Sequence, residues 1–283
     1  MEIKTIGVVG CGLMGSGIAE VCARAGYDVV VREADQAFLD AGLSRVRRSL
    51  EKAVQRAKLE QAQADEALGR IQGTVALSDM AECDLVVEAV TENMVLKKQI
   101  FSELDKILAP EAILSSNTSS LSITEMASAT ERGDRVLGIH FFNPVPVMPL
   151  IEFVRTILTS DETMHTAREF GESLGKTMVT AKDTPGFIVN RLLIPYLLDA
   201  VRVYENGLAT KEDIDTAIKL GLNHPMGPLT LLDFVGLDTC LFIADAMYDE
   251  YKDARYAAPP LLRRMVLAGQ MGRKSGKGFY DYG

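Results

Sequence analysis

The stretch IGVVGCGLMGSGIAE, residues 6–20, joins an apolar run to three glycines and then to a helical pattern. Gly10, Gly12 and Gly15 have the spacing G-x-G-x-x-G between a predicted strand and a predicted helix, which is the context required for a dinucleotide-binding turn. The first glycine allows the tight turn, the second lets the backbone approach a pyrophosphate, and the third lets helix and strand pack closely. The alternative is a glycine-rich turn without a ligand. The predicted cofactor loop also includes Leu13 and Met14.

An acidic residue follows about 20 positions later, as this kind of turn requires. Glu33 stands at the end of the second predicted strand, where its carboxylate can accept hydrogen bonds from the adenosine ribose and repel a 2′-phosphate. This favours NAD as the cofactor. Arg32 keeps NADP open, because a guanidinium beside Glu33 can stack on adenine or tolerate the extra phosphate.

The composition narrows the class of protein. A chain of 283 residues, 47% hydrophobic and 24% charged, suits two globular domains. The formal net charge of −9 argues against a nucleic-acid partner, and no apolar run reaches the roughly 18 residues of a membrane span. Four scattered cysteines and three distant histidines predict neither disulfides nor a metal site. With no secretory pattern at the N-terminus, we expect a reducing compartment, the cytoplasm.

Strand and helix patterns alternate along the first two-thirds of the chain. Strands are predicted at 3–9, 28–31, 83–90, 112–117 and 135–141, and helices at 18–25, 36–59, 65–71 and 95–108. This order predicts an α/β fold with a Rossmann-like, mostly parallel sheet. We expect this domain to span residues 1–183, with a helical excursion at about 36–71.

The remainder, residues 184–283, shows only helical patterns and predicts an all-α C-terminal domain. Helices are predicted at 184–207, 210–221, 228–251 and 259–269. Pro195 predicts a kink in the first, and Thr210 with Asp213 predicts a capping box at the start of the second. Apolar stripes in this domain indicate a surface for a partner.

The stretch HFFNPVPVMPLIE, residues 140–152, begins with a histidine and ends with a carboxylate. Taken alone, His140 reads most simply as a histidine at a strand end beside a proline-rich turn. If the strands on either side pair antiparallel, His140 and Glu152 lie close together near the turn. A histidine has a pKa near neutrality and suits proton removal from a hydroxyl group, while a carboxylate on the other ring nitrogen fixes the tautomer.

Two further polar residues have both a functional and a structural interpretation. Ser119 follows a predicted strand, at the sheet edge where open α/β folds bind ligands, but a serine-rich loop is also an ordinary turn. Asn190 lies inside a predicted helix among apolar neighbours, where asparagine is unfavourable for the helix. It either reaches a substrate or bonds between helices.

A basic island interrupts this acidic chain. SRVRRSLEKAVQRAK, residues 44–58, carries six basic side chains against one acid. Arg45, Arg48, Lys52 and Arg56 have helical spacing and can share a face that would bind phosphate groups. A solvated charged helix is the alternative for any one of them.

These residues together resemble a known family, the short-chain L-3-hydroxyacyl-CoA dehydrogenases of the bacterial 3-hydroxybutyryl-CoA dehydrogenase type. The matching segments run from residue 6 to the end of the chain, and several are long and distinctive. They are GVVGCGLMGSGIAEV, EAVTEN, SSNTSSLSIT, GIHFFNPVPVMPLIE, KDTPGFIVNRLLIPYLLDA, ATKEDIDTAIKLGLNHPMGPLTLLDFVGLD and GRKSGKGFYDY.

The resemblance implies reversible, NAD-dependent oxidation of a 3-hydroxyacyl-CoA to a 3-oxoacyl-CoA. It implies that His140 is the catalytic base, that Glu152 is its partner, and that Ser119 and Asn190 hold the reacting end of the substrate. The positions implied for the nicotinamide side are Glu92, Lys97, Asn117, Ser119 and Asn143, and those for coenzyme A are Ser49, Lys52 and Arg56. Arg56 departs from the family, which often has lysine there. The resemblance also implies a homodimer formed through the C-terminal domain.

Two other functions stay open at this point. A sugar-acid dehydrogenase of the L-gulonate type would share the glycine loop and the histidine–glutamate pair without needing the basic island. A non-catalytic NAD-binding protein would not need His140, Glu152, Ser119 and Asn190 together.

Overall fold

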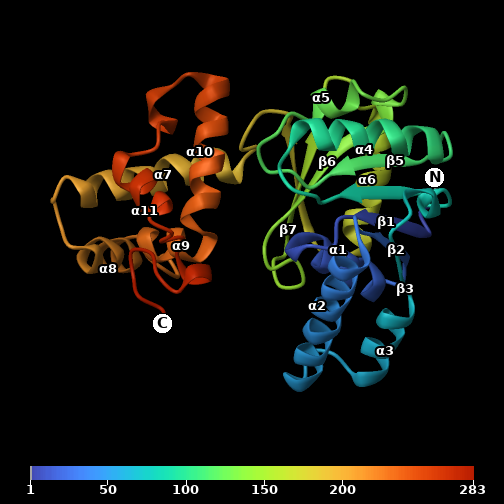
Figure 1. Cartoon of the computed structure of the whole chain (residues 1–283), viewed down its shortest axis with the longest axis horizontal. Helices are drawn as coiled ribbons and strands as arrows, with labels where there is room; N and C mark the ends of the chain where they lie inside the picture. The colour runs from blue at the N-terminus through green and yellow to red at the C-terminus, as the bar shows by residue number, and fades with distance from the viewer. Residues whose placement is uncertain (1) are drawn as a thin grey trace. The chain divides into compact units, whose positions relative to one another are not determined.

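The computed structural model describes residues 2–283, and the chain divides into two compact units. The first ends at Thr184 and the second runs from Pro185 to Gly283 (Figure 1). Met1, the first residue of the predicted N-terminal domain, lies outside the described residues. The first unit is α/β and the second is helical, which confirms the predicted fold class.

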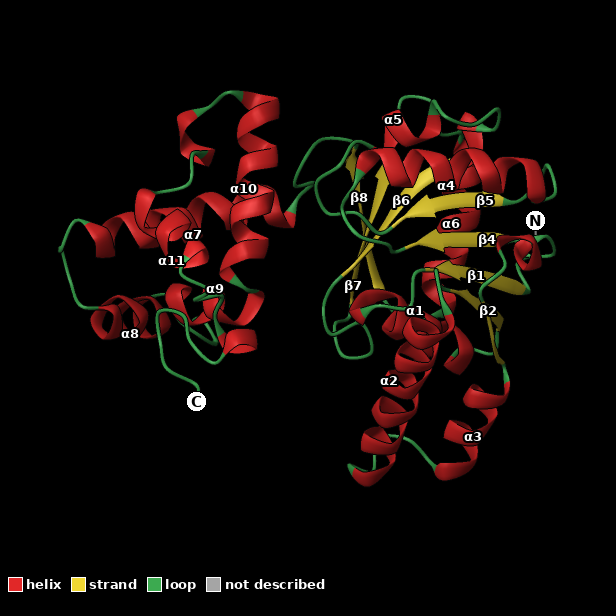
Figure 2. Cartoon of the chain, viewed as in Figure 1, coloured by secondary structure: helices red, strands yellow, loops and turns green. Residues whose placement is uncertain are grey.

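The first unit is built on an eight-stranded sheet with the strand order β3-β2-β1-β4-β5-β6-β7-β8 (Figure 2). Neighbouring strands run parallel, except for the antiparallel pair β6 and β7. The strands are β1 (Thr5–Val9), β2 (Asp28–Arg32), β3 (Ile71–Thr74), β4 (Leu85–Glu88), β5 (Ile113–Ser116), β6 (Val136–Phe141), β7 (Leu150–Arg155) and β8 (Thr177–Lys182).

Helices cover both faces of this sheet, as the alternating pattern predicts. Ile18 of α1 and Phe170 of α6 share one apolar cluster with Ile139 of β6 and Phe153 of β7, so these two helices pack on the same face. In Figure 2, α4 and α5 lie over the other face. The helices of this unit are α1 (Leu13–Arg24), α2 (Gln36–Gln55), α3 (Gln61–Gly69), α4 (Met94–Ile107), α5 (Ile123–Ala127) and α6 (Asp161–Ser173).

The strand order reverses between β1 and β4. In an open α/β sheet, ligands bind beyond the carboxyl ends of the strands at this switch point. Gly10 directly follows β1, and Ala89 directly follows β4. The glycine loop therefore stands at the position where this fold binds its ligand.

The structure corrects several predicted boundaries in this unit. Helix α1 begins at Leu13, not at residue 18, because the glycine turn passes directly into helix. The excursion ends at Gly69, and residue 71 already belongs to β3. Strands β3 and β8 were not predicted; β3 is an edge strand of four residues with a glycine, and polar threonines interrupt the apolar pattern of β8.

The second unit consists of α7 (Val189–Glu205), α8 (Lys211–Gly221), α9 (Pro228–Val235), α10 (Leu237–Tyr251) and α11 (Pro260–Leu267). Helix α7 begins five residues later than predicted, and it continues through Pro195, where the kink stays a prediction. The Thr210 hydroxyl accepts a bond from the Asp213 N–H, which confirms the N-cap half of the predicted capping box, while the Asp213 carboxylate accepts from the Thr210 hydroxyl. The single helix predicted at 228–251 was wrong, because Gly236 separates α9 from α10 with a φ of +105°.

Buried carboxylates fix the second unit. Asp215 of α8 accepts hydrogen bonds from the N–H groups of Leu229 and Thr230, in the first turn of α9. First-turn N–H groups have no acceptor within their own helix, and the Asp215 carboxylate supplies one. Asp233 of α9 accepts bonds from the N–H groups of Phe279 and Tyr280. The C-terminal segment is thereby attached to the helical core.

All four cysteines are buried free thiols. Burial and the nearby charge of Glu33 raise the pKa of Cys11 to about 11. Burial also raises the pKa of Cys83 and of Cys240 to about 12, and that of Cys22 further still. These thiols are therefore protonated at neutral pH and act as small apolar core residues.

Candidate active site

The glycine loop has the shape that the spacing predicts. Gly10 has a φ of +96°, which side-chain-bearing residues rarely adopt, and a Cβ there would lie 2.8 Å from the carbonyl oxygen of Ala89. A Cβ on Gly15 would overlap the carbonyl oxygen of Gly10. A Cβ on Gly12 would meet no atom within 4 Å, so this side of the loop is open. The loop thus offers backbone and a helix N-terminus to a phosphate group.

Glu33 follows β2 and is held against the glycine loop. Its carboxylate accepts the Cys11 N–H at 2.7 Å and the Ala34 N–H at 2.8 Å. Arg45 of α2 donates to the carbonyl oxygen of Cys11 at 3.0 Å. The acidic residue expected at the ribose position is therefore fixed beside the loop. Arg45, by contrast, turns to the loop, although the spacing had placed it with the other basic residues of α2.

His140 and Glu152 lie in register on the antiparallel strands β6 and β7. Directly paired residues of such strands project from the same face of the sheet, and here His140 Nδ1 is 2.8 Å from Glu152 Oε2. His140 is 6% exposed and Glu152 is fully buried. The structure confirms the strand pairing assumed from the sequence. With an ionised carboxylate, Nδ1 is the donor, and proton transfer falls to Nε2.

The loop after β5 approaches the histidine through Asn117. The Asn117 Oδ1 accepts the N–H of Phe141, the residue after His140, at 2.9 Å. Further along the loop, the Ser119 N–H and the Thr118 hydroxyl both donate to the carboxylate of Glu92. The bond made by the Asn117 side chain and the bonds accepted by Glu92 thus hold the segment that carries Ser119.

A buried ion pair lies next to this loop. Lys97 of α4 and Glu88 at the end of β4 are at most 1% exposed, and the ammonium lies 2.7 and 2.8 Å from the two carboxylate oxygens. Glu88 also accepts bonds from the Val90 N–H and the Ser116 hydroxyl. The Lys97 ammonium lies 3.4 Å from Glu92. Lys97 therefore connects Glu88 to the carboxylate that holds Ser119, and a direct contact with a cofactor stays a prediction.

Glu88 is the residue that reading the sequence missed. It closes the apolar strand LVVE, residues 85–88, and a carboxylate at the end of a buried strand was the available signal. Buried carboxylates require partners, so a lysine within reach should have been expected. Lys97 had been assigned only to the nicotinamide side.

The basic residues assigned to coenzyme A lie on one flank of α2. Lys52 and Arg56 are exposed, and Ser49 is half-buried. Ser49 faces the buried Glu20 of α1; burial raises the pKa of Glu20, while hydrogen bonds from Ser49 and Arg24 lower it. The exposed cations remain available to a phosphate, whereas the Ser49 hydroxyl already has a protein partner.

Two further predicted site residues come from other segments of the chain. Asn143 is exposed in the loop between β6 and β7. Asn190 belongs to the second unit and lies in the first turn of α7, not in mid-helix as expected. Because first-turn N–H groups have no intrahelical partner, asparagine carries little cost at this position.

Residues 2–283 contain neither a cluster of metal-ligating side chains nor a membrane-spanning helix. No group of three or more histidine, cysteine, aspartate or glutamate side chains there is arranged to hold a metal ion. None of the described helices is long and apolar enough to cross a membrane.

A glycine loop at the switch point of a sheet with this strand order defines a dinucleotide-binding protein. Residues 5–184 match the family model of the 3-hydroxyacyl-CoA dehydrogenase NAD binding domain, and residues 186–282 match that of its C-terminal domain. The chain therefore belongs to the 3-hydroxyacyl-CoA dehydrogenase family, and it is an NAD-dependent oxidoreductase.

Individual relatives agree with this assignment. The chain is 52% identical to a 3-hydroxybutyryl-CoA dehydrogenase of Mycobacterium tuberculosis over 282 residues, 99% of each chain. It is 46% identical to the human mitochondrial hydroxyacyl-coenzyme A dehydrogenase, covering 99% of this chain and 91% of the human one. The crystal structure of M. tuberculosis FadB2 superimposes with a TM-score of 0.99 at 52% identity, and covers all of both chains.

Proposed function

We propose that the protein interconverts (3S)-3-hydroxyacyl-CoA and 3-oxoacyl-CoA, with 3-hydroxybutyryl-CoA as the substrate. The observation that carries the proposal is the buried pair of His140 and Glu152, 2.8 Å apart, at the edge of a dinucleotide-binding sheet. The relatives named 3-hydroxybutyryl-CoA dehydrogenase support the acyl-CoA assignment.

NAD, when bound, accepts the hydrogen of substrate C3 together with its electron pair. In the proposed oxidation His140 Nε2 removes the proton of the 3-hydroxyl group, so that the carbonyl can form. Glu152 keeps the proton of the neutral ring on Nδ1 and stabilises the imidazolium that results. In the reverse direction the same imidazolium returns its proton to the 3-oxygen.

The open face at Gly12 and the fixed carboxylate of Glu33 fit an NAD molecule. We infer that the loop from Gly10 to Gly15 holds the pyrophosphate and that Glu33 accepts the ribose hydroxyls, disfavouring NADP. Glu92, Asn117 and Asn143 then belong to the nicotinamide side, and Ser119 to both the cofactor and the substrate. The role of Asn190 stays a prediction that rests on the family resemblance.

The exposed cations of α2 support coenzyme A as the carrier of the substrate. Lys52 and Arg56 would bind its phosphate groups, which need local positive charge in a chain of net −9. A sugar acid offers no such phosphates. We also infer a cytoplasmic homodimer, for which the four reduced thiols and the exposed leucines of the second unit provide support.

The proposal is tested by following NADH oxidation with acetoacetyl-CoA. Turnover with acetoacetyl-CoA and NADH, with lower kcat/KM for NADPH, is expected. L-gulonate with NAD serves as the competing substrate, because a sugar-acid dehydrogenase would use it without coenzyme A. Turnover of L-gulonate combined with inactivity toward acetoacetyl-CoA would overturn the proposal. Initial rates across acyl chains from C4 to C12 then define the preferred length.

A further inference from the structure

The loop between β6 and β7, residues 142–149, joins the strand of His140 to the strand of Glu152. Three of its residues are prolines, which have no N–H to donate. Within the loop, the N–H groups of Val147 and Met148 both bond to the Pro144 carbonyl. The loop therefore depends on contacts from outside to hold its position.

Lys176 supplies such contacts from the turn between α6 and β8. Its ammonium donates to the carbonyl oxygen of Val145 at 2.8 Å and to that of Met148 at 2.7 Å. These are the lengths of charge-assisted hydrogen bonds. The next residue, Thr177, donates its N–H to the Pro149 carbonyl at 2.7 Å. One turn of the chain thus bonds to the loop at three carbonyl groups.

The loop is also packed against α1. Val145 is 2% exposed and belongs to the main apolar cluster of the first unit. A Cβ on Gly17 of α1 would lie 2.9 Å from Val145, so helix and loop approach closely there. Lys176 therefore fixes a loop that is already seated against α1.

Phe142 connects the loop to the histidine. Its ring centroid lies 4.6 Å from that of His140, with the rings tilted by 55°. Such a contact restricts the rotation of the imidazole, as offset aromatic pairs do. A shift of the loop would move Phe142 and release the ring that Glu152 orients.

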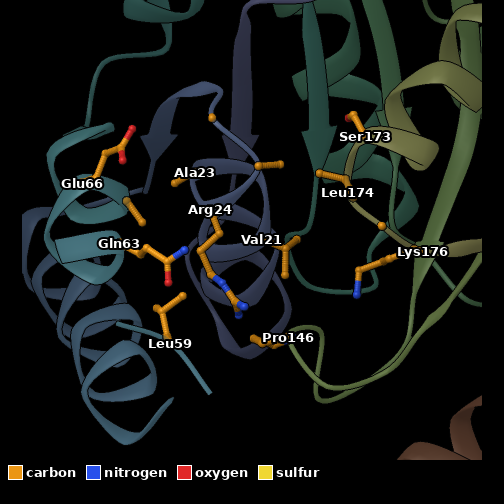
Figure 3. Close-up of a pocket in the computed structure, with 14 residues that line it drawn as sticks. Val21, Ala23, Arg24, Leu59, Gln63, Glu66, Pro146, Ser173, Leu174 and Lys176 are labelled. Atoms are coloured by element: carbon orange, nitrogen blue, oxygen red, sulfur yellow. The ribbon is translucent and has the colours of Figure 1, made fainter. Parts of the chain in front are cut away.

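The Lys176 ammonium has three donors on a flexible stem, which lets one side chain bond to two carbonyl oxygens. It lines a cavity of about 420 Å³ whose lining also includes Pro146 and Arg24 (Figure 3). Burial and the charge of Arg24 lower the pKa of Lys176.

We propose that Lys176 is a positioning residue, which holds the loop at residues 142–149 and, through Phe142, the orientation of His140 toward Glu152. The effect on catalysis rests on the proposed function. The effect on the loop does not.

The test compares Lys176→Met, which keeps the length and removes the donors, with Lys176→Arg, which keeps the charge. Lys182→Met is the matched control, since Lys182 is an exposed lysine at the far end of β8, the strand that follows Lys176. Hydrogen exchange of the peptide covering residues 142–149 should accelerate at least tenfold in Lys176→Met and stay unchanged in Lys182→Met.

In the acetoacetyl-CoA assay, Lys176→Met should lose kcat by 10- to 100-fold while KM for NADH stays within twofold. Lys176→Arg should recover most of the loss. Unchanged exchange in the loop, or a kcat within twofold of the parent, would overturn the proposal. A parent enzyme inactive with acyl-CoA would overturn the proposed function, and hydrogen exchange alone would then decide the role of Lys176.

Discussion

At the scale of single residues, two buried pairs at one edge of the sheet have different tasks. His140 and Glu152 form a hydrogen-bonded pair whose second ring nitrogen, Nε2, is not used by that bond. Lys97 and Glu88 form an ion pair whose charges are bonded to each other and to the neighbouring loops. The first pair is suited to proton transfer, and the second is suited to holding the loop that carries Ser119 in place.

Replacing His140 by glutamine should lower kcat by about 10²–10⁴-fold, the usual contribution of a general acid or base. Binding of NADH, measured by its fluorescence, should persist because His140 lies outside the glycine loop. His165→Gln is the control, since His165 is exposed on α6 and pairs only with Glu169 at the surface. A fully active His140→Gln enzyme would rule out the base assignment.

Replacing Lys97 by methionine should lower the free energy of unfolding by about 3–5 kcal/mol, because it leaves the Glu88 carboxylate buried without its cation. Urea denaturation measures the change. Lys98→Met is the control: Lys98 is half-exposed and pairs with Glu125, and such pairs contribute roughly 0–1 kcal/mol. Adding Glu88→Gln to Lys97→Met should restore part of the stability. If the single variant is as stable as the parent, the ion pair does not support the loop.

At the scale of elements, helix α2 has one buried apolar face and one exposed basic face. Leu39, Val46 and Leu50 are buried within the first unit, while Lys52 and Arg56 are exposed. The spacing of basic residues predicted a shared face for four of them. It could not predict that Arg45 would turn to the Cys11 carbonyl, because that bond depends on how α2 packs beside the glycine loop.

Replacing both Lys52 and Arg56 by alanine should raise KM for acetoacetyl-CoA about tenfold or more, since each charge-assisted bond to a phosphate contributes roughly 1.5–3 kcal/mol when desolvated and less at an exposed site. KM for a truncated thioester without the nucleotide should hardly change. The control replaces Lys4 and Lys106, two exposed lysines of the same unit outside residues 44–58, with the same change in net charge. Equal effects on both substrates would show that the flank does not bind coenzyme A.

Sequence patterns predicted some elements well and others poorly for physical reasons. Buried parallel strands such as LVVE, residues 85–88, are continuous apolar runs and were found. The pairing of His140 with Glu152 was found because a hairpin loop fixes the register of its strands. The break at Gly236 was missed, because a glycine within an apolar pattern does not reveal its backbone angle.

At the scale of the molecule, each unit has an apolar core of its own. The change from alternating to purely helical patterns near residue 184 was visible in the sequence, and the contacts within the structure divide at the same place. The sequence predicted which residues belong to the candidate site, but not which of them form hydrogen bonds and ion pairs with one another. Which side chain holds which depends on distances between distant segments, such as that from Glu88 to Lys97.

The second unit exposes several large apolar side chains, among them Leu192, Leu208 and Leu220. We expect light scattering to give a mass about twice that of the 30.9 kDa chain. Replacing Leu208 and Leu220 by lysine should lower this mass toward that of the monomer. The control introduces lysine at Val95 and Ile157, which are exposed on the first unit. A monomeric parent at micromolar concentration would contradict the predicted homodimer.

The burial of every cysteine has a practical consequence for studies of motion in this enzyme. With thiol pKa values of about 11 or higher, the folded protein offers almost no thiolate to a maleimide or a spin label at neutral pH. A cysteine introduced on an exposed helix, for example at Arg47, would then be the reactive thiol. Spectroscopic probes can therefore be placed on either unit of the natural protein without first removing its own cysteines.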